Sequence, residues 1–143
     1  MGYYVSLEEA DFKIPENETV LKVLKDLNKR NDLKTGGSWS AGKQDRVWFA
    51  WMPEKYDETV TSVAEVFNLL GFETDTESYD GEYVGLTYYD SKTGSEDIFI
   101  DAVAPFVADG SYLSWRGEEG ERWRQVVEHG KITTHYATTV WSN

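Results

Sequence analysis

Hydrophobic residues recur with the spacing of an α-helix in three segments, residues 15–30, 56–72 and 95–107. Within each segment these residues fall on one face, as they do in a helix that covers a core. They are Val20, Leu21, Leu24 and Leu27 in the first segment, Val60, Val63, Ala64, Phe67 and Leu70 in the second, and Ile98, Phe99, Ala102, Val103 and Phe106 in the third. The pattern therefore predicts three amphipathic helices.

Residues that start or stop helices stand at the ends of these segments. Pro15 suits the first turn of a helix, and Asp57 is a good N-terminal cap for the second helix. Gly71 can adopt the left-handed conformation that ends a helix. Pro105 is expected to kink or end the third helix because proline has no backbone N–H to donate.

Compact runs of β-branched and aromatic residues predict strands at residues 2–7 and 46–52. A hairpin is expected around the turn Asp80-Gly81, with its strands in residues 72–78 and 82–89. The last third of the chain predicts an antiparallel meander, because short glycine-containing turns join three further strand-like runs. These runs are residues 111–118, 121–129 and 131–141.

The predicted order is βαβ, a second helix, ββ, a third helix and three strands. This order predicts an α+β sandwich with a mainly antiparallel sheet and helices on one face. The best topology is a ferredoxin-like sandwich with a C-terminal three-stranded meander. A chain of 143 residues fits a single domain over residues 1–143, and neither a repeat nor a long linker divides it.

Composition narrows the class of protein. The chain is 40% hydrophobic and 15% aromatic, which is typical of a folded domain. It contains no cysteine, so disulfides, thiolate zinc sites and cysteine nucleophiles are excluded. Because residues 1–12 lack the pattern of a signal peptide and no long apolar run follows, we expect a cytoplasmic protein without a membrane partner.

The segment GSWSAGKQ, residues 37–44, resembles a phosphate-binding loop in its spacing of glycine and lysine. A working phosphate loop follows a buried strand, opens a helix and carries Ser or Thr after its lysine. Here a polar segment precedes the loop, a predicted strand follows it, and Gln44 stands after Lys43. We therefore interpret the segment as a mobile connection between a helix and a strand.

Other catalytic and metal-binding signals are weak. The acidic run DTESYDGE, residues 75–82, lacks the glycine position of a calcium loop, and His129 and His135 have no partner at a ligand spacing. No nucleophile elbow is found. We predict no catalytic residues, no metal and no cofactor, and we attribute the six tryptophans mainly to packing, with Trp115 and Trp123 paired across a turn.

Charge is distributed unevenly along the chain, whose net charge is −12. Residues 47–121 hold 17 acidic residues against three basic ones, whereas residues 22–46 hold seven basic residues against three acidic ones. The densest acidic runs are Glu73, Asp75, Glu77, Asp80 and Glu82, and Glu118, Glu119 and Glu121. These residues either keep the protein soluble or form a face that docks on a basic partner, and direct nucleic-acid binding is disfavoured.

Several segments together resemble a group of small proteins encoded by phages and prophages, chiefly of actinobacterial type. The segments are MGYY…DFKIP, NDLKTGGSW, FAWM, LLGFE and YDSKTGSEDIFIDAVAPFVADGSYLSWRGEEGERWR. The layout around WRGEEGERW is also similar to the ferredoxin-like domain of YubB-type plasmid and phage proteins. The resemblance implies a phage protein acting in the cytoplasm of a host cell, and it assigns no activity or catalytic residues.

Three classes of function follow from these observations. The leading hypothesis is a non-enzymatic phage-type protein that binds a host or phage protein with a basic surface, for example as an inhibitor occupying a nucleic-acid-binding or defence-system site. The alternative is a protein that binds a small ligand or nucleotide signal through the Gly-rich basic loop 34–46, using Trp39, Lys43 and Arg46. The third class is an enzyme, although the sequence offers no site for it.

Overall fold

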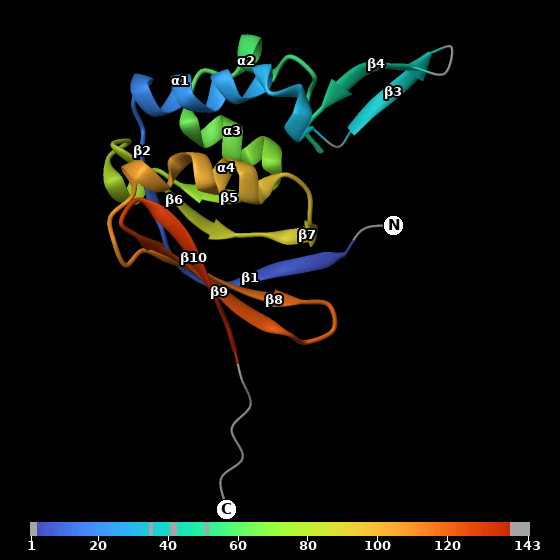
Figure 1. Cartoon of the computed structure of the whole chain (residues 1–143). Helices are drawn as coiled ribbons and strands as arrows, with labels where there is room; N and C mark the ends of the chain where they lie inside the picture. Colours follow the sequence, from blue (N-terminus) through green and yellow to red (C-terminus); the bar gives the residue numbers. More distant parts are fainter. Residues whose placement is uncertain (1–2, 35, 41–42, 51, 138–143) are drawn as a thin grey trace, which may run out of the picture.

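The computed structural model describes residues 3–34, 36–40, 43–50 and 52–137. The chain has an α+β fold in which the helices lie on one side of antiparallel strands (Figure 1). A hairpin, β3–β4, projects from the helical side, and the C-terminal strands lie farthest from it (Figure 1). Within the described ranges, no helix is long and apolar enough to cross a membrane.

The largest sheet has five strands in the order β10-β9-β8-β1-β7. They are β1 (Tyr4–Asp11), β7 (Asp90–Lys92), β8 (Tyr112–Gly117), β9 (Arg122–Glu128) and β10 (Lys131–Tyr136). A second sheet has the order β2-β6-β5, with β2 (Lys13–Pro15), β5 (Glu73–Asp75) and β6 (Tyr83–Tyr88). The third is the hairpin of β3 (Gly36–Ser40) and β4 (Lys43–Trp48). The strand pairs in all three sheets are antiparallel.

The first two sheets are joined through bends at Phe12 and Tyr89. Phe12 separates β1 from β2, and Tyr89 separates β6 from β7. Backbone hydrogen bonds cross the junction, from Leu7 N to Tyr89 O at 2.8 Å and from Leu86 N to Phe12 O at 3.0 Å. Strands β1 and β2 therefore run as one bent strand beside β6 and β7.

Four helices cover this bent sheet. They are α1 (Glu18–Asp26), α2 (Tyr56–Thr59), α3 (Val63–Leu70) and α4 (Glu96–Val103), and short 3₁₀ turns extend α1 and α4. Asn17 caps α1 by accepting a hydrogen bond from Val20 N at 2.9 Å. As predicted, Gly71 ends α3 with a left-handed φ of 115°, and the α-helical part of α4 ends before Pro105.

The single helix predicted over residues 56–72 is wrong, because the structure breaks it at Val60. Val60 has an extended backbone, and Ser62, rather than Asp57, caps α3 by accepting from Glu65 N at 3.1 Å. Glu65 in turn accepts from Thr61 N and from the Thr61 hydroxyl. Thr61, Ser62 and Glu65 thus satisfy the backbone groups that a continuous helix would otherwise pair.

The interpretation of residues 37–44 as a mobile connection is also wrong for most of its length. β3 and β4 occupy residues 36–40 and 43–48, and the strand predicted over 46–52 ends at Trp48. Gly36 lies opposite Trp48, and a Cβ on Gly36 would meet the Trp48 ring at 2.3 Å. A glycine that looked like a loop signal therefore makes room for a cross-strand aromatic ring.

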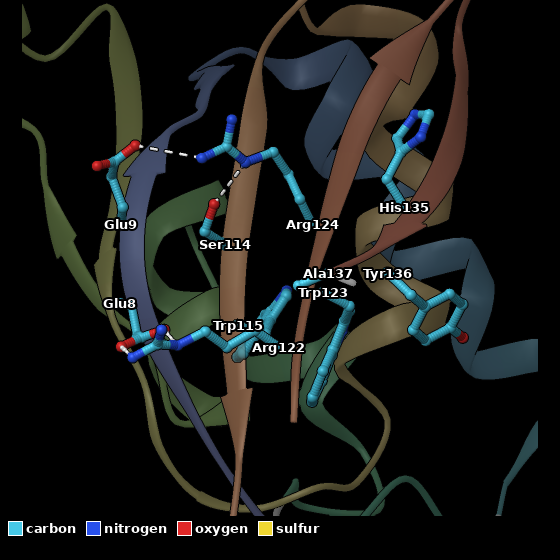
Figure 2. A pocket seen from close by; sticks show the side chains of 10 residues that line it. All are labelled: Glu8, Glu9, Ser114, Trp115, Arg122, Trp123, Arg124, His135, Tyr136 and Ala137. Atoms are coloured by element: carbon cyan, nitrogen blue, oxygen red, sulfur yellow. Dashed lines mark hydrogen bonds and ion pairs between the residues drawn. The ribbon is translucent and has the colours of Figure 1, made fainter. Parts of the chain in front are cut away.

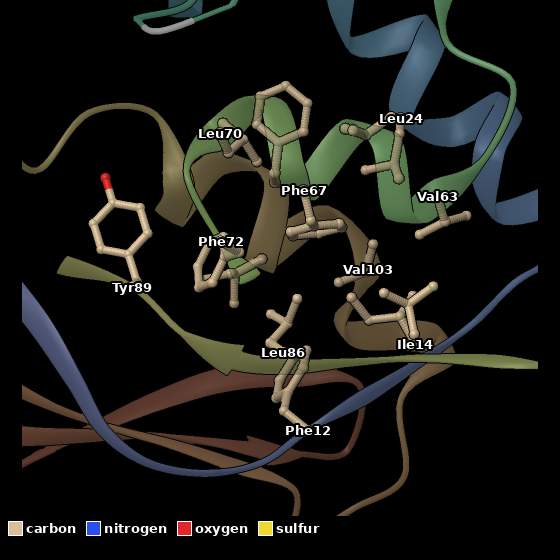
Figure 3. Packing of buried hydrophobic residues seen from close by; sticks show 14 of the residues in the cluster. Phe12, Ile14, Leu24, Val63, Phe67, Leu70, Phe72, Leu86, Tyr89 and Val103 are labelled. Atoms are coloured by element: carbon tan, nitrogen blue, oxygen red, sulfur yellow. The ribbon is translucent and has the colours of Figure 1, made fainter. Parts of the chain in front are cut away.

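The core lies between the helices and the bent sheet. Phe67 and Leu70 of α3 face Leu86 of β6 and Phe12 at the bend (Figure 3), and each of these side chains is buried. The ring of Phe72 extends the core toward the larger sheet, since it lies 6.0 Å from that of Trp115. Burial of these apolar and aromatic side chains is the main favourable contribution to folding.

Glu16 connects the end of β2 to the start of α3. Its carboxylate accepts hydrogen bonds from Val63 N at 2.8 Å and Ala64 N at 3.1 Å, although 47 positions separate Glu16 from Val63. A carboxylate at this position satisfies free N–H groups and also interacts favourably with the positive end of the helix dipole. Glu16 therefore fixes where α3 begins relative to the sheet.

Glu16→Gln should lower the free energy of unfolding by about 1 kcal/mol, because the amide keeps one acceptor but loses the charge and one charge-assisted bond. Urea denaturation monitored by tryptophan fluorescence would measure the change. The control is Glu119→Gln, which removes an equal charge from an exposed turn. Equal effects of the two substitutions would contradict the capping role of Glu16.

Candidate functional site

The acidic residues singled out in the sequence form two separate groups in the structure. Glu73, Asp75, Glu77, Asp80 and Glu82 lie on β5 and on the loop that joins it to β6; we call this group the acidic loop. Glu118, Glu119 and Glu121 form the turn between β8 and β9. All of these acidic residues except Asp75 are exposed.

The two groups lie at opposite ends of the bent strand formed by β1 and β2. At one end, Glu118 N donates to Tyr4 O at 3.0 Å; at the other, Glu16 N donates to Glu82 O at 2.9 Å. Twelve positions separate Tyr4 from Glu16, so the two groups contact this strand at widely separated points. The predicted acidic residues therefore do not form one continuous face.

Tyr79 anchors the acidic loop to the sheet. Its ring lies against Gly85 of β6, where an added Cβ would be only 3.0 Å from Tyr79 Cε2. The ring also packs edge-on against Tyr83, at 6.2 Å between centroids. Lys13 Nζ lies over both rings, 5.3 Å from the centroid of Tyr79 and 4.7 Å from that of Tyr83, so cation–π contacts add to the packing.

The backbone of the acidic loop is also fixed. Asp75 Oδ1 accepts from Ser78 N at 3.1 Å, and hydrogen bonds from Ser78 hold the pKa of the Asp75 carboxyl below its usual value. Asp80 and Gly81 both have left-handed backbone conformations, with φ of 54° and 77°, and Gly81 N donates to Thr76 O at 2.9 Å. Aspartate and glycine are residues that tolerate this conformation.

The remaining carboxylates of the acidic loop point into solvent. Glu73, Glu77, Asp80 and Glu82 form no ion pair with a lysine or arginine in the part of the chain that the structure describes. Four negative charges are thus presented on a loop whose shape is set by Tyr79 and Asp75. Such a surface can attract cationic groups without paying a large ordering cost on binding.

The Gly-rich basic segment has the backbone of a β-hairpin. Ser38 pairs with Arg46, Trp39 with Gln44 and Ser40 with Lys43. Lys43 begins a strand, so the strand-loop-helix context of a phosphate loop is absent at this segment, as the sequence analysis predicted. The side chains of Trp39, Lys43 and Arg46 lie outside the described residues.

A hollow of about 520 Å³ lies on the face of the large sheet that points away from the helices (Figure 2). Side chains alternate along a strand, so the buried Trp115 faces the core and its neighbours Ser114 and Arg116 face outward. The outward side chains around the hollow come from β1, β8, β9 and β10. They are Glu8, Glu9, Ser114, Arg122, Arg124 and His135.

Carboxylates hold two arginines in this hollow. Arg122 Nε lies 3.0 Å from Glu8 Oε1 (Figure 2). Arg124 Nε donates to Ser114 Oγ at 2.7 Å, and its Nη2 lies 3.6 Å from Glu9 Oε1 (Figure 2). This arrangement could not be predicted from the sequence, because the residues come from separate strands and only the strand pairing brings them together.

His135, Trp115 and Trp123 have structural partners. His135 Nε2 lies 3.1 Å from Glu128 Oε1, and no group of three potential metal ligands is found among the described residues. The predicted pairing of Trp115 with Trp123 is confirmed, with stacked rings 6.5 Å apart. The sequence did not reveal that Trp115 Nε1 donates to the buried Gln125, at 2.7 Å.

Comparisons of the chain with protein-family models, curated proteins and solved structures found no significant match.

Gly85→Ala should destabilise the acidic loop, because the new Cβ would press on the Tyr79 ring. We expect a loss of about 1–2 kcal/mol in the free energy of unfolding, together with faster amide exchange over residues 76–82. Urea denaturation and hydrogen exchange would measure both effects.

The control for this prediction is the same substitution in a Tyr79→Ala background, where the ring is absent. If Gly85→Ala costs as much stability there as in the natural chain, contact with Tyr79 does not explain the glycine.

Proposed function

We propose that the protein binds another protein, one with a basic surface, through the acidic loop. The observation that carries this proposal is a fixed loop with four exposed carboxylates, Glu73, Glu77, Asp80 and Glu82, that have no cationic partner within the described ranges. Complementary charge increases the rate of association and favours partners with the matching pattern. A net charge of −12 disfavours an extended nucleic acid as the partner.

The packing of Tyr79 supports a binding role over a purely solubilising one. Solubility requires only exposed charge and no fixed arrangement. In this loop, Tyr79 occupies the space above Gly85, Lys13 covers its ring, and Asp75 bonds to Ser78. A pre-organised loop loses less conformational entropy when a partner binds.

The resemblance to phage-encoded proteins makes the partner a protein of the host or of the phage itself. In this proposal the protein is a non-enzymatic inhibitor that occupies a basic site, such as the nucleic-acid-binding surface of a host nuclease or defence complex. The site of action is the host cytoplasm. Salt should weaken the complex because ions screen charge pairs at its rim.

A ferredoxin-like arrangement is part of the same proposal. The order β1–β2, α1, β5, β6–β7, α4 and β8 has the β-α-β-β-α-β form of that fold when each bent strand is counted once. The β3–β4 hairpin, α2 and α3 are then additions before β5. The hydrogen bonds at Phe12 and Tyr89 support counting the strands in this way. β9 and β10 then form the added meander with β8.

Removing the charges of the acidic loop should abolish partner binding. The variant Glu73→Gln, Glu77→Gln, Asp80→Asn, Glu82→Gln leaves Asp75 in place, and asparagine tolerates the left-handed conformation of residue 80. Affinity purification from an actinobacterial host lysate at low and high salt, read by mass spectrometry, would identify a basic partner. With that purified partner, we expect the variant to bind at least about tenfold more weakly.

The matched comparison is Glu118→Gln, Glu119→Gln, Glu121→Gln, which removes charge from the β8–β9 turn at the other end of the sheet. This variant should keep the affinity of the natural chain. If both variants lose affinity equally, net charge and not the acidic loop controls binding. If only the turn variant loses affinity, the proposed site is wrong.

A further inference from the structure

Three arginines lie close together on the outer face of the large sheet, although the chain as a whole is acidic. Arg116 on β8 lies directly opposite Arg122 on β9, and Arg124 follows on the same face of β9. Like charges placed directly opposite each other destabilise a sheet. The chain has 26 acidic and 14 basic residues, so this pair of arginines calls for a specific explanation.

Arg122 and Arg116 differ in their side-chain partners. Glu8 accepts from Arg122, with Nε at 3.0 Å and Nη2 at 3.5 Å. The Arg116 side chain is exposed, and its guanidinium has no hydrogen-bond or ion-pair partner among the residues that the structure describes. One guanidinium is therefore held in place beside another whose donors have no partner within the described ranges.

Arg124 is fixed beside this pair. Its guanidinium carbon lies 4.3 Å from the centroid of the Tyr112 ring, and Tyr112 also donates to Glu9 Oε1 at 2.6 Å. With Ser114 Oγ at 2.7 Å from Nε, Arg124 is held on three sides. Arg124 therefore provides a positive charge at a defined position while it keeps these contacts.

Hollows lie on both sides of the arginine pair. Arg122 lines the 520 Å³ hollow described above, and Arg116 lines a second one of about 420 Å³ with Tyr4, Ser6 and Asp90. Volumes of this order are typical of small-molecule sites. Each of the two opposed arginines therefore lines one of the hollows.

We propose that Arg116 and Arg122 bind the phosphate group of a small phosphorylated molecule. A phosphate monoester has three terminal oxygens, so it can accept from the fork of Arg116 and also from Nη1 of Arg122, whose Nε and Nη2 face Glu8. Its negative charge would relieve the repulsion between the two arginines. The rest of the molecule would occupy the 520 Å³ hollow, beside Arg124 and His135.

The surrounding carboxylates favour a small ligand over a nucleic acid. Glu8 and Glu9 border one hollow, and Asp90 and Glu118 border the other. They would repel the successive phosphates of an extended strand while leaving room for a single phosphate at the arginine pair. This site is independent of the acidic loop proposed to bind a protein.

The test uses inorganic phosphate, adenosine 5′-monophosphate and adenosine as probes on the full chain. Titrations followed by NMR of the arginine Nε–H groups should show saturable shifts at Arg116 and Arg122 with both phosphate probes and none with adenosine. Tighter binding of the nucleotide than of phosphate supports an organic group in the 520 Å³ hollow, whereas equal binding overturns the assignment of that hollow to the ligand. Absence of saturable shifts up to millimolar probe overturns the proposal.

Two variants distinguish binding at the arginine pair from nonspecific attraction to positive charge. Arg116→Gln should weaken binding of the phosphate probes at least tenfold, and Arg30→Gln, which removes an equal charge near Asp32, should leave it unchanged. Equal weakening by both variants, or tighter binding of a single-stranded oligonucleotide than of the mononucleotide, would overturn the proposal.

The stability of Arg116→Gln in phosphate-free buffer gives a second readout. Because Arg116 has no partner within the described ranges and faces another arginine, this variant should melt at the same temperature as the natural chain or higher. A clearly lower melting temperature would show that Arg116 serves the fold, and would overturn its assignment as a ligand-binding residue.

Discussion

The bend at Phe12 and Tyr89 determines the arrangement of the rest of the molecule. Both side chains are buried, and the hydrogen bonds from Leu7 to Tyr89 and from Leu86 to Phe12 keep the two strands paired across the bend. Without this junction, the three-stranded and five-stranded sheets would each need their own layer of helices to bury their apolar faces. With it, one layer of helices and one core serve both sheets, and the acidic loop and the β8–β9 turn are held at opposite ends.

Much of the fold could be predicted because local signals agree with the tertiary structure. The α+β class, the C-terminal meander and the glycine end of α3 all follow from periodicity and turn residues. The errors arose where side chains competed with the regular backbone or where elements are short. Ser62 and Glu65 break a helix that the spacing of apolar residues predicted to be continuous. β2 and β7 each have three residues, too few to show a period.

The candidate sites were predictable only in part, because one is local in the sequence and the other is not. The acidic loop is a contiguous run, so composition revealed its charge, although not that Tyr79 rests on Gly85. The arginine pair depends on the register between β8 and β9, and Glu8 reaches Arg122 from a strand more than 100 residues earlier. No spacing rule connects such residues, because strand pairing alone brings them together.

The charged residues of this protein therefore differ in whether they have ion-pair partners, and the net charge alone does not describe them. At the acidic loop, four carboxylates on a fixed backbone have no ion-pair partner among the described residues, which suits long-range attraction of a cationic surface. On the outer sheet face, carboxylates hold Arg122 and Arg124 in place, whereas the Arg116 guanidinium has no partner in the part of the chain that the structure describes. The negative net charge of the protein is unfavourable to the binding of an anion there. The free energy of binding must therefore come from the geometry of the contacts. That requirement selects a compact anion able to contact two guanidinium groups at once over any extended polyanion.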